Sequence, residues 1–356
     1  MQNPFTTTFS KMPDQTYILT EEPAEIIDNF SYEKPAESVY KITGVRGSGK
    51  TVTLAKVEEA YTSEENRKAG WLVYRLSPSR DLLRQFAAML YKEDFIKKNE
   101  QSRSISVNAS VFGTGGEFGV SKTSRNEMFD IGVEIEAMIL AARDNGKKIL
   151  IGIDEISKNE DMIAFASEFG KWLRADYPVY MVCTGLYENI HELSNVKNLT
   201  FFRRASTIKT RPLNVVRMSE MYRTKLSISG NEARNMAEMT KGYAYAFQML
   251  GILCFRRREN ETMEDILAAF RTELFAYSYE KIWEELSRED RRLVRLLTDK
   301  DEYKREELLT GLGEKAGSYS VYRDRLLKRG VITARQGYIS LALPCFGEYV
   351  KEYGQE

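Results

Sequence analysis

Eight consecutive residues in the first part of the chain have the types and spacing needed to hold a polyphosphate. They are Gly44, Val45, Arg46, Gly47, Ser48, Gly49, Lys50 and Thr51, and they satisfy the pattern G-x-x-x-x-G-K-[ST] at every fixed position. Glycines let consecutive backbone N–H groups turn inward around phosphate oxygens, and the start of the following helix adds its positive dipole end. In this pattern the Lys50 ammonium reaches the β- and γ-phosphates, and the Thr51 hydroxyl binds Mg²⁺. The sequence therefore predicts a phosphate loop, with a glycine-rich turn that binds nothing as the alternative.

A second group of candidate residues follows an apolar run further along the chain. Residues 148–153 read Lys-Ile-Leu-Ile-Gly-Ile and are followed by Asp154 and Glu155, which is typical of a buried parallel strand with a polar end. Nucleotide hydrolysis needs a carboxylate that orders Mg²⁺ and a group that orients water. We expect Asp154, with Thr51, to hold Mg²⁺ and Glu155 to polarise the attacking water. A solvated acidic loop is the alternative interpretation.

The elements that must position these residues alternate between strands and helices. Apolar runs predict strands at residues 38–43, 70–76, 148–153, 179–183 and 207–211. Helical periodicity predicts helices at residues 23–30, 52–61, 81–91, 126–143 and 160–175. This alternation favours an α/β fold built on a doubly wound parallel sheet.

Two further units are expected after this core. Beyond residue 212 the pattern is helical only, and three polar residues are the expected N-caps: Ser219, Asn231 and Thr262. From residue 287, three short helical segments and a hairpin that turns at Gln336-Gly337 form the outline of a winged helix. We therefore divide the chain into a core of residues 1–212 with a β-hairpin insert near 104–121, an all-α lid of residues 213–286 and a winged helix of residues 287–356.

Composition bounds the partners and the compartment. The 356 residues include 52 Lys and Arg against 52 Asp and Glu, so any basic surface that attracts nucleic acid must be local. Residues 1–10 lack the features of a signal peptide, and no apolar run approaches the ~18 residues of a membrane span. The cysteines Cys183, Cys254 and Cys345 lie far apart in apolar surroundings, which indicates buried free thiols. We expect a cytoplasmic protein without membrane contact.

These motifs, in this order, resemble the AAA+ branch of phosphate-loop ATPases, in particular prokaryotic proteins related to origin-recognition and replication-initiator ATPases. The resemblance rests on residues 43–51, on Asp154 and Glu155, and on the succession of core, lid and winged helix. The segments Asn3-Pro4-Phe5 and Gly185-Leu186 are also similar to bacterial members. The resemblance implies ATP and ADP as ligands, with Mg²⁺, and hydrolysis of ATP to ADP and phosphate.

The resemblance also implies roles for residues outside the phosphate loop. Thr184, at the end of the fourth strand, takes the place of the polar sensor that contacts the γ-phosphate or the water. Arg203 or Arg204 takes the place of the arginine finger that acts on a neighbouring subunit's nucleotide; pairing with local carboxylates is the alternative. The lid segment 240–248 has no arginine where initiator-type proteins carry their second sensor, as in related signal-transduction ATPases of STAND type. No Gly-Arg box assigns adenine recognition. A switch that hydrolyses slowly is implied.

Basic side chains follow the third helix and the hairpin of the expected winged helix. In such domains the third helix enters the major groove, so Arg323, Arg325 and Lys328, with Arg335 in the wing, are candidate contacts to duplex DNA. Residues 287–356 nevertheless hold 14 Lys and Arg against 12 Asp and Glu, a weak electrostatic footprint. Winged helices also bind proteins. The sequence thus leaves two partners open, namely DNA for an initiator-like switch and a protein for a STAND-type ATPase.

Overall fold

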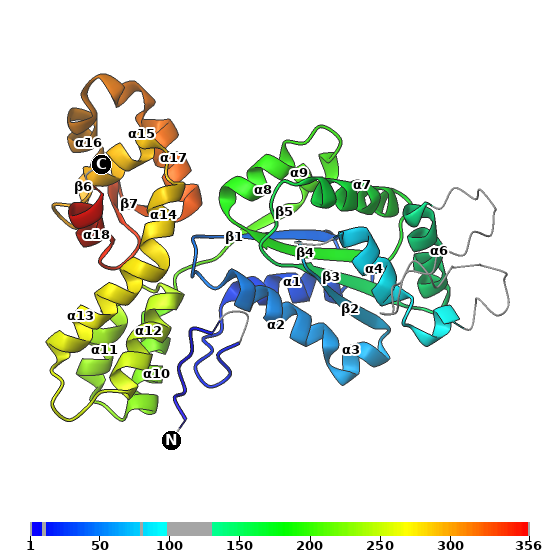
Figure 1. Ribbon diagram of the computed structural model, residues 1–356, viewed down its shortest axis with the longest axis horizontal. Helices are drawn as coiled ribbons and strands as arrows, with labels where there is room; N and C mark the ends of the chain where they lie inside the picture. The colour runs from blue at the N-terminus through cyan, green and yellow to red at the C-terminus, as the bar shows by residue number, and fades with distance from the viewer. Residues whose placement is uncertain (1, 9–11, 79–80, 98–129, 355–356) are drawn as a thin grey trace, which may run out of the picture.

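A parallel sheet forms the centre of the computed structural model, which describes residues 2–8, 12–78, 81–97 and 130–354 (Figure 1). Its five strands lie in the order β2-β3-β4-β1-β5. The strands are β1 (Val39–Thr43), β2 (Trp71–Leu76), β3 (Lys148–Ile153), β4 (Val179–Gly185) and β5 (Ser206–Lys209). The expected α/β fold with a parallel sheet is confirmed. The β-hairpin expected near 104–121 lies outside the described residues.

Helices bury both faces of this sheet (Figure 1). One face packs against α1 (Glu21–Ser31) and α2 (Lys50–Thr62), and the other packs against α4 (Leu82–Leu90), α6 (Ile131–Asp144) and α7 (Glu160–Arg174). Further core helices in the described part of the chain include α3 (Glu64–Lys68), α8 (Tyr187–Ser194) and α9 (Thr200–Arg204). Along β4, Tyr180 and Val182 face α2, whereas Met181 and Cys183 face α7. Burial on both faces explains why the strands read as nearly continuous apolar runs.

The segment between β5 and residue 286 contains helices only, and we call this segment the lid. It comprises α10 (Val215–Leu226), α11 (Gly230–Met239), α12 (Ala244–Phe255), α13 (Met263–Leu274), the π-helix η2 (Phe275–Tyr279) and α14 (Glu280–Glu285). The expected N-cap Thr262 is confirmed, because its side chain and that of Asp265 form a capping box. The predictions for the other two N-caps are wrong. Ser219 and Asn231 lie inside α10 and α11, and the side chains of Asn214 and Ser229 cap these helices instead.

The last part of the chain, the C-terminal unit, combines short helices with a small antiparallel sheet. Its elements are α15 (Arg288–Arg295), β6 (Tyr303–Lys304), α16 (Arg305–Leu312), the 3₁₀ helix η3 (Gly313–Ser318), α17 (Tyr319–Arg329), β7 (Ile332–Arg335), β8 (Tyr338–Leu341) and α18 (Phe346–Tyr353). Figure 1 shows the lid and the C-terminal unit along one side of the core. One cluster of buried apolar side chains continues from the lid into this unit. Within the described ranges, no helix has the length and apolar character required to cross a membrane.

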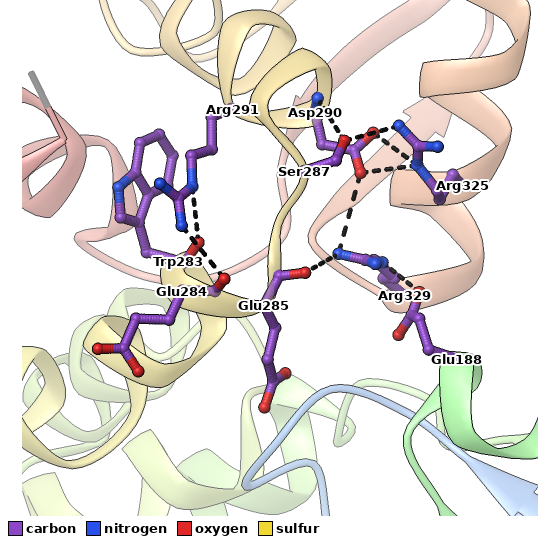
Figure 2. Close-up of polar contacts among 9 residues, drawn as sticks. All are labelled: Glu188, Trp283, Glu284, Glu285, Ser287, Asp290, Arg291, Arg325 and Arg329. Atoms are coloured by element: carbon purple, nitrogen blue, oxygen red, sulfur yellow. Dashed lines mark hydrogen bonds and ion pairs between the residues drawn. The ribbon is translucent and has the colours of Figure 1, made fainter. Parts of the chain in front are cut away.

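An ion pair between a buried carboxylate and a half-buried guanidinium joins two helices of the C-terminal unit (Figure 2). The Asp290 side chain is fully buried, and the Arg325 Nε atom donates to its two carboxylate oxygens at 2.7 and 2.9 Å. The same guanidinium donates to Ser287 Oγ at 2.8 Å. Ser287 in turn caps α15 by accepting the backbone N–H of Asp290 at 3.1 Å. Three residues from two helices therefore satisfy each other's charges and donors.

Replacing Asp290 with alanine should destabilise the protein strongly, because the Arg325 guanidinium loses its carboxylate partner. We expect the free energy of unfolding, followed by circular dichroism in urea, to fall by about 3 kcal/mol. Asp324→Ala is the matched control, since it removes the more exposed pair of Asp324 with Arg323 (3.0 Å). That change should cost less than about 1 kcal/mol. Equal losses of unfolding free energy in the two variants would show that the pair of Asp290 with Arg325 stabilises the protein no more than the exposed pair does.

Candidate functional site

The phosphate loop lies between β1 and α2 and encloses its own lysine. Gly47 and Gly49 have φ values of 74° and 95°, in the left-handed region that side chains rarely adopt. The Lys50 ammonium is buried and donates to the backbone carbonyl oxygens of Gly44 and Val45, both at 3.1 Å. The glycines therefore give the loop the curvature that the sequence pattern predicts.

Burial disfavours the charged form of the Lys50 side chain. Burial lowers the pKa of its ammonium to about 8, against the opposing influence of the carboxylates of Glu155 and Asp154. The nearby Arg46 guanidinium lowers this pKa further. Two cations thus stand together on the loop, and an anion bound there would relieve their repulsion and the desolvation of Lys50.

Three side chains from different elements meet beside the loop. Residue alternation along β3 and β4 directs Asp154 and Thr184 toward α2, whose first turn carries Thr51, and the two strands pair at Ile153 and Cys183. The Thr51 hydroxyl donates to an Asp154 carboxylate oxygen at 2.9 Å, and the buried Thr184 hydroxyl donates to the other. A carboxylate and a hydroxyl at this distance are the oxygen ligands that Mg²⁺ prefers.

Glu155 leaves the strand direction at the end of β3. Its φ of 55° is left-handed, and its backbone N–H donates to Thr184 Oγ1 at 3.0 Å. The next residue, Ile156, donates its N–H to the carbonyl oxygen of Thr184 at 2.8 Å. These two bonds fix the turn and leave the Glu155 carboxylate exposed on the wall of a cavity. The position suits a group that orients water.

That cavity has a volume of about 320 Å³ and lies between the core and the lid. Its walls come from the phosphate loop, from the N-terminal segment around Thr6 and Thr16, from residues after β5, and from the lid. The side-chain oxygen of Gln248 in α12 accepts hydrogen bonds from the Thr6 backbone N–H at 3.0 Å and from the Thr16 hydroxyl at 3.1 Å. The N-terminal segment is thus fastened to the lid, and the cavity has the size of a small-molecule site.

Tyrosines of the lid contact the phosphate loop directly, which sequence reasoning missed. The Tyr243 hydroxyl donates to the Arg46 carbonyl at 2.6 Å and shares a hydrogen bond with Ser278 Oγ. The Tyr245 backbone N–H donates to the Gly47 carbonyl at 3.0 Å, and its ring stacks on Tyr277 with centroids 4.3 Å apart. Sequence reasoning considered residues 240–248 as a lid element that lacks an arginine, and it assigned no role to their tyrosines. The available signal was the pair of tyrosines that follows Gly242 in this segment.

The remaining candidate residues lie away from the cavity. Arg203 and Arg204 are exposed on α9, and Arg203 Nε donates to the Ser194 carbonyl at 3.3 Å. The structure therefore places neither arginine at the cavity of its own chain.

The candidate DNA contacts have different surroundings. Arg335 is exposed in β7, Arg323 pairs with Asp324, and Lys328 lies over the Tyr187 ring of α8 at 5.7 Å. We correct the expectation for Arg325, because its guanidinium binds the buried Asp290 and is directed into the C-terminal unit (Figure 2).

Comparison with known proteins adds a family model and solved structures. Residues 276–350 match a model described as Domain of unknown function (DUF8462), which covers the end of the lid and most of the C-terminal unit. No match was found among curated protein sequences.

Two archaeal structures resemble nearly the whole chain. The Walker-type ATPase PABY2304 of Pyrococcus abyssi superposes with a TM-score of 0.66 at 12% identity, over 98% of this chain and 99% of that one. The ORC2 protein of Aeropyrum pernix, solved as ADPNP-ADP complexes, gives a TM-score of 0.53 at 13% identity, over 93% and 92% of the two chains. At such identities the likeness concerns the fold. The chain shares the overall fold of these two proteins, which agrees with the parallel-sheet core predicted from its sequence.

Proposed function

We propose that this protein binds ATP with Mg²⁺ between core and lid and hydrolyses it slowly, as a molecular switch. The observation that carries the proposal is the cavity, which brings the phosphate loop, Glu155 and the lid tyrosines to one place. Thr51 and Asp154 fit Mg²⁺ because their oxygen atoms lie 2.9 Å apart at the end of the loop. When bound, the ion supplies charge stabilisation for the phosphates.

In this proposal each residue of the site has a distinct task. The Lys50 ammonium binds the β- and γ-phosphates, for which it exchanges its present carbonyl partners. Glu155 orients the attacking water and accepts its proton, and Thr184 holds Asp154 and the Glu155 turn in place. Arg203 or Arg204 acts on the nucleotide of a neighbouring copy. Turnover is slow because the lid contributes tyrosines where other family members contribute an arginine.

We further propose three domains, with boundaries at 1–212, 213–286 and 287–356, the last being a winged helix that contacts duplex DNA. Arg323, Lys328 and Arg335 are the remaining candidates for the DNA contacts. In the present conformation α17 lies against α8 of the core, so this helix must separate from the core before it can enter a groove. The protein would act in the cytoplasm, where its three free cysteines stay reduced.

A protein partner is the second candidate, and one observation favours it. The surface of α17 already makes a protein contact, since Lys328 lies over Tyr187 and Arg329 pairs with Glu188 of the same core helix. A STAND-type switch would exchange this internal contact for an external protein.

Nucleotide binding and turnover should separate in two variants. Lys50→Ala removes the phosphate cation and should raise the Kd for ATP at least about tenfold. Glu155→Gln should keep the Kd within about threefold and lower kcat about a hundredfold. Titration calorimetry and phosphate release measure the two quantities. Glu160→Gln, an exposed change at the start of α7, is the control. Unchanged turnover in Glu155→Gln would contradict the assigned role.

Affinity for nucleotide should fall as pH rises above 8. Burial gives Lys50 a pKa of about 8 in the free protein, and a bound polyphosphate raises this pKa again. Binding therefore takes up a proton, and the Kd should rise toward about tenfold per pH unit between pH 8 and 10. Lys50→Arg keeps its charge throughout this window and should show no such slope. The same slope in both proteins would assign the titration to another group.

Binding of duplex DNA should weaken steeply with salt if the winged helix reads DNA. Arg323→Ala and Arg335→Ala should each lower the magnitude of the slope of log K against log salt by about one. Arg234→Ala on α11 removes an exposed arginine of the lid and is the control. Fluorescence anisotropy with a labelled duplex measures these slopes. Absence of salt-dependent binding in the wild type would favour the protein partner.

A further inference from the structure

The side chain of Arg46 extends from the phosphate loop toward the hinge that joins the lid to the C-terminal unit. It lines the nucleotide cavity next to Lys50. One terminal guanidinium nitrogen lies 3.5 Å from a carboxylate oxygen of Glu285. The Nε atom is buried and has no hydrogen-bond partner in the described part of the chain. This guanidinium therefore has one donor that no described residue satisfies, in a residue that lines the cavity.

Glu285 occupies the hinge itself, because it is the last residue of α14 and precedes the C-terminal unit. Its backbone carbonyl accepts a hydrogen bond from Arg329 at 2.8 Å. Arg329 is nearly buried, pairs with Glu188 of α8 and lies 3.9 Å from the Asp290 carboxylate. Figure 2 shows Arg329 of the C-terminal unit next to Glu188 of the core, Asp290 and the backbone carbonyl of Glu285, whose side chain points away from Arg329.

The phosphate loop contacts the same two parts of the chain at other points. The carbonyls of Arg46 and Gly47 accept hydrogen bonds from Tyr243 and Tyr245 of the lid. Gly330, which ends α17, is so near that a Cβ atom on it would lie 3.7 Å from Val45. A conformational change of this loop would therefore alter its contacts with both the lid and the C-terminal unit.

The pair of Arg46 with Glu285 is weak enough to be exchanged. Both side chains are more than a third exposed (39% and 36%), and such pairs contribute little because water and ions screen them. Phosphate oxygens bind a guanidinium more strongly, through two parallel charge-assisted hydrogen bonds. A triphosphate on the loop would also bring several negative charges against the single charge of Glu285.

We propose that Arg46 binds the phosphates of the nucleotide and leaves Glu285 when it does so, which loosens the C-terminal unit from the core. This inference rests on the proposed nucleotide site. It assigns to the phosphate loop an arginine contact that the lid lacks. It also makes the hinge responsive to the charge on the loop, because nucleotide and Glu285 compete for one guanidinium.

Nucleotide affinity tests the competition in opposite directions. Glu285→Gln removes the competitor, so the Kd for AMP-PNP with Mg²⁺ should fall about three- to fivefold. Arg46→Ala removes the contact, so the Kd should rise about tenfold or more. Glu284→Gln is the matched control, because it makes the same charge change one residue away and breaks only the exposed pair with Lys281. Its Kd should equal that of the wild type.

Energy transfer between two dyes tests the movement in the full chain. Lys68→Cys in the core and Gln336→Cys in the hairpin carry the dyes, with Cys254 and Cys345 replaced by alanine; both labelled positions are exposed. AMP-PNP should change the transfer efficiency in the wild type. Glu285→Gln should show a smaller change in the same direction without nucleotide, and Glu284→Gln should show none.

Two results would overturn the inference. One is a Glu285→Gln variant that binds AMP-PNP no more tightly than Glu284→Gln, and the other is a transfer efficiency that nucleotide does not alter. Failure of the wild-type protein to bind AMP-PNP at all is a different outcome, since it would remove the nucleotide site on which the inference rests.

Discussion

The buried ammonium of Lys50 is the group around which the rest of the site is arranged. A charge taken out of water is costly unless oxygen atoms surround it. Here the carbonyls of Gly44 and Val45 supply two acceptors, and Asp154 and Glu155 supply a favourable field. The positive φ angles of Gly47 and Gly49 allow the loop to turn this tightly. These contacts offset part of the cost of burying the Lys50 ammonium, and an anion bound to the loop would offset more of it.

Much of this site is encoded locally, and that part could be predicted from the sequence. The phosphate loop is one continuous segment whose residues act at fixed spacing, so its motif reveals it. Asp154 follows from the end of an apolar strand. Thr184 needed more, because its contact with Asp154 depends on the pairing of β3 with β4, which alternation within one strand does not reveal. The resemblance to a family selected Thr184 as a polar sensor but did not predict its contact with Asp154.

Contacts between distant segments explain what could not be predicted. A basic helix read as a DNA-binding face includes Arg325, whose partner Asp290 lies in another helix, and charge patterns in one segment do not identify such partners. Tyr243 binds a loop carbonyl through its hydroxyl and Tyr245 binds another through its backbone N–H, and the tyrosine pair in the sequence does not identify these acceptors. Strand β6 is only the two residues Tyr303 and Lys304, too short to show any alternation. Sequence patterns thus located the elements better than their mutual contacts.

The position of α17 links the two proposed partners to the same physical event. Arg329 and Lys328 hold this helix on α8, which begins shortly after the Thr184 that binds Asp154. A ligand that takes α17 from the core must break these contacts, whether that ligand is a DNA duplex or a protein. Coupling between binding sites is reciprocal. Such a ligand would therefore change the affinity for nucleotide by the same factor by which nucleotide changes the affinity for that ligand. In the proposed switch, the identity of the partner would therefore change the output, whereas the mechanism, competition for the contacts around the phosphate loop, would stay the same.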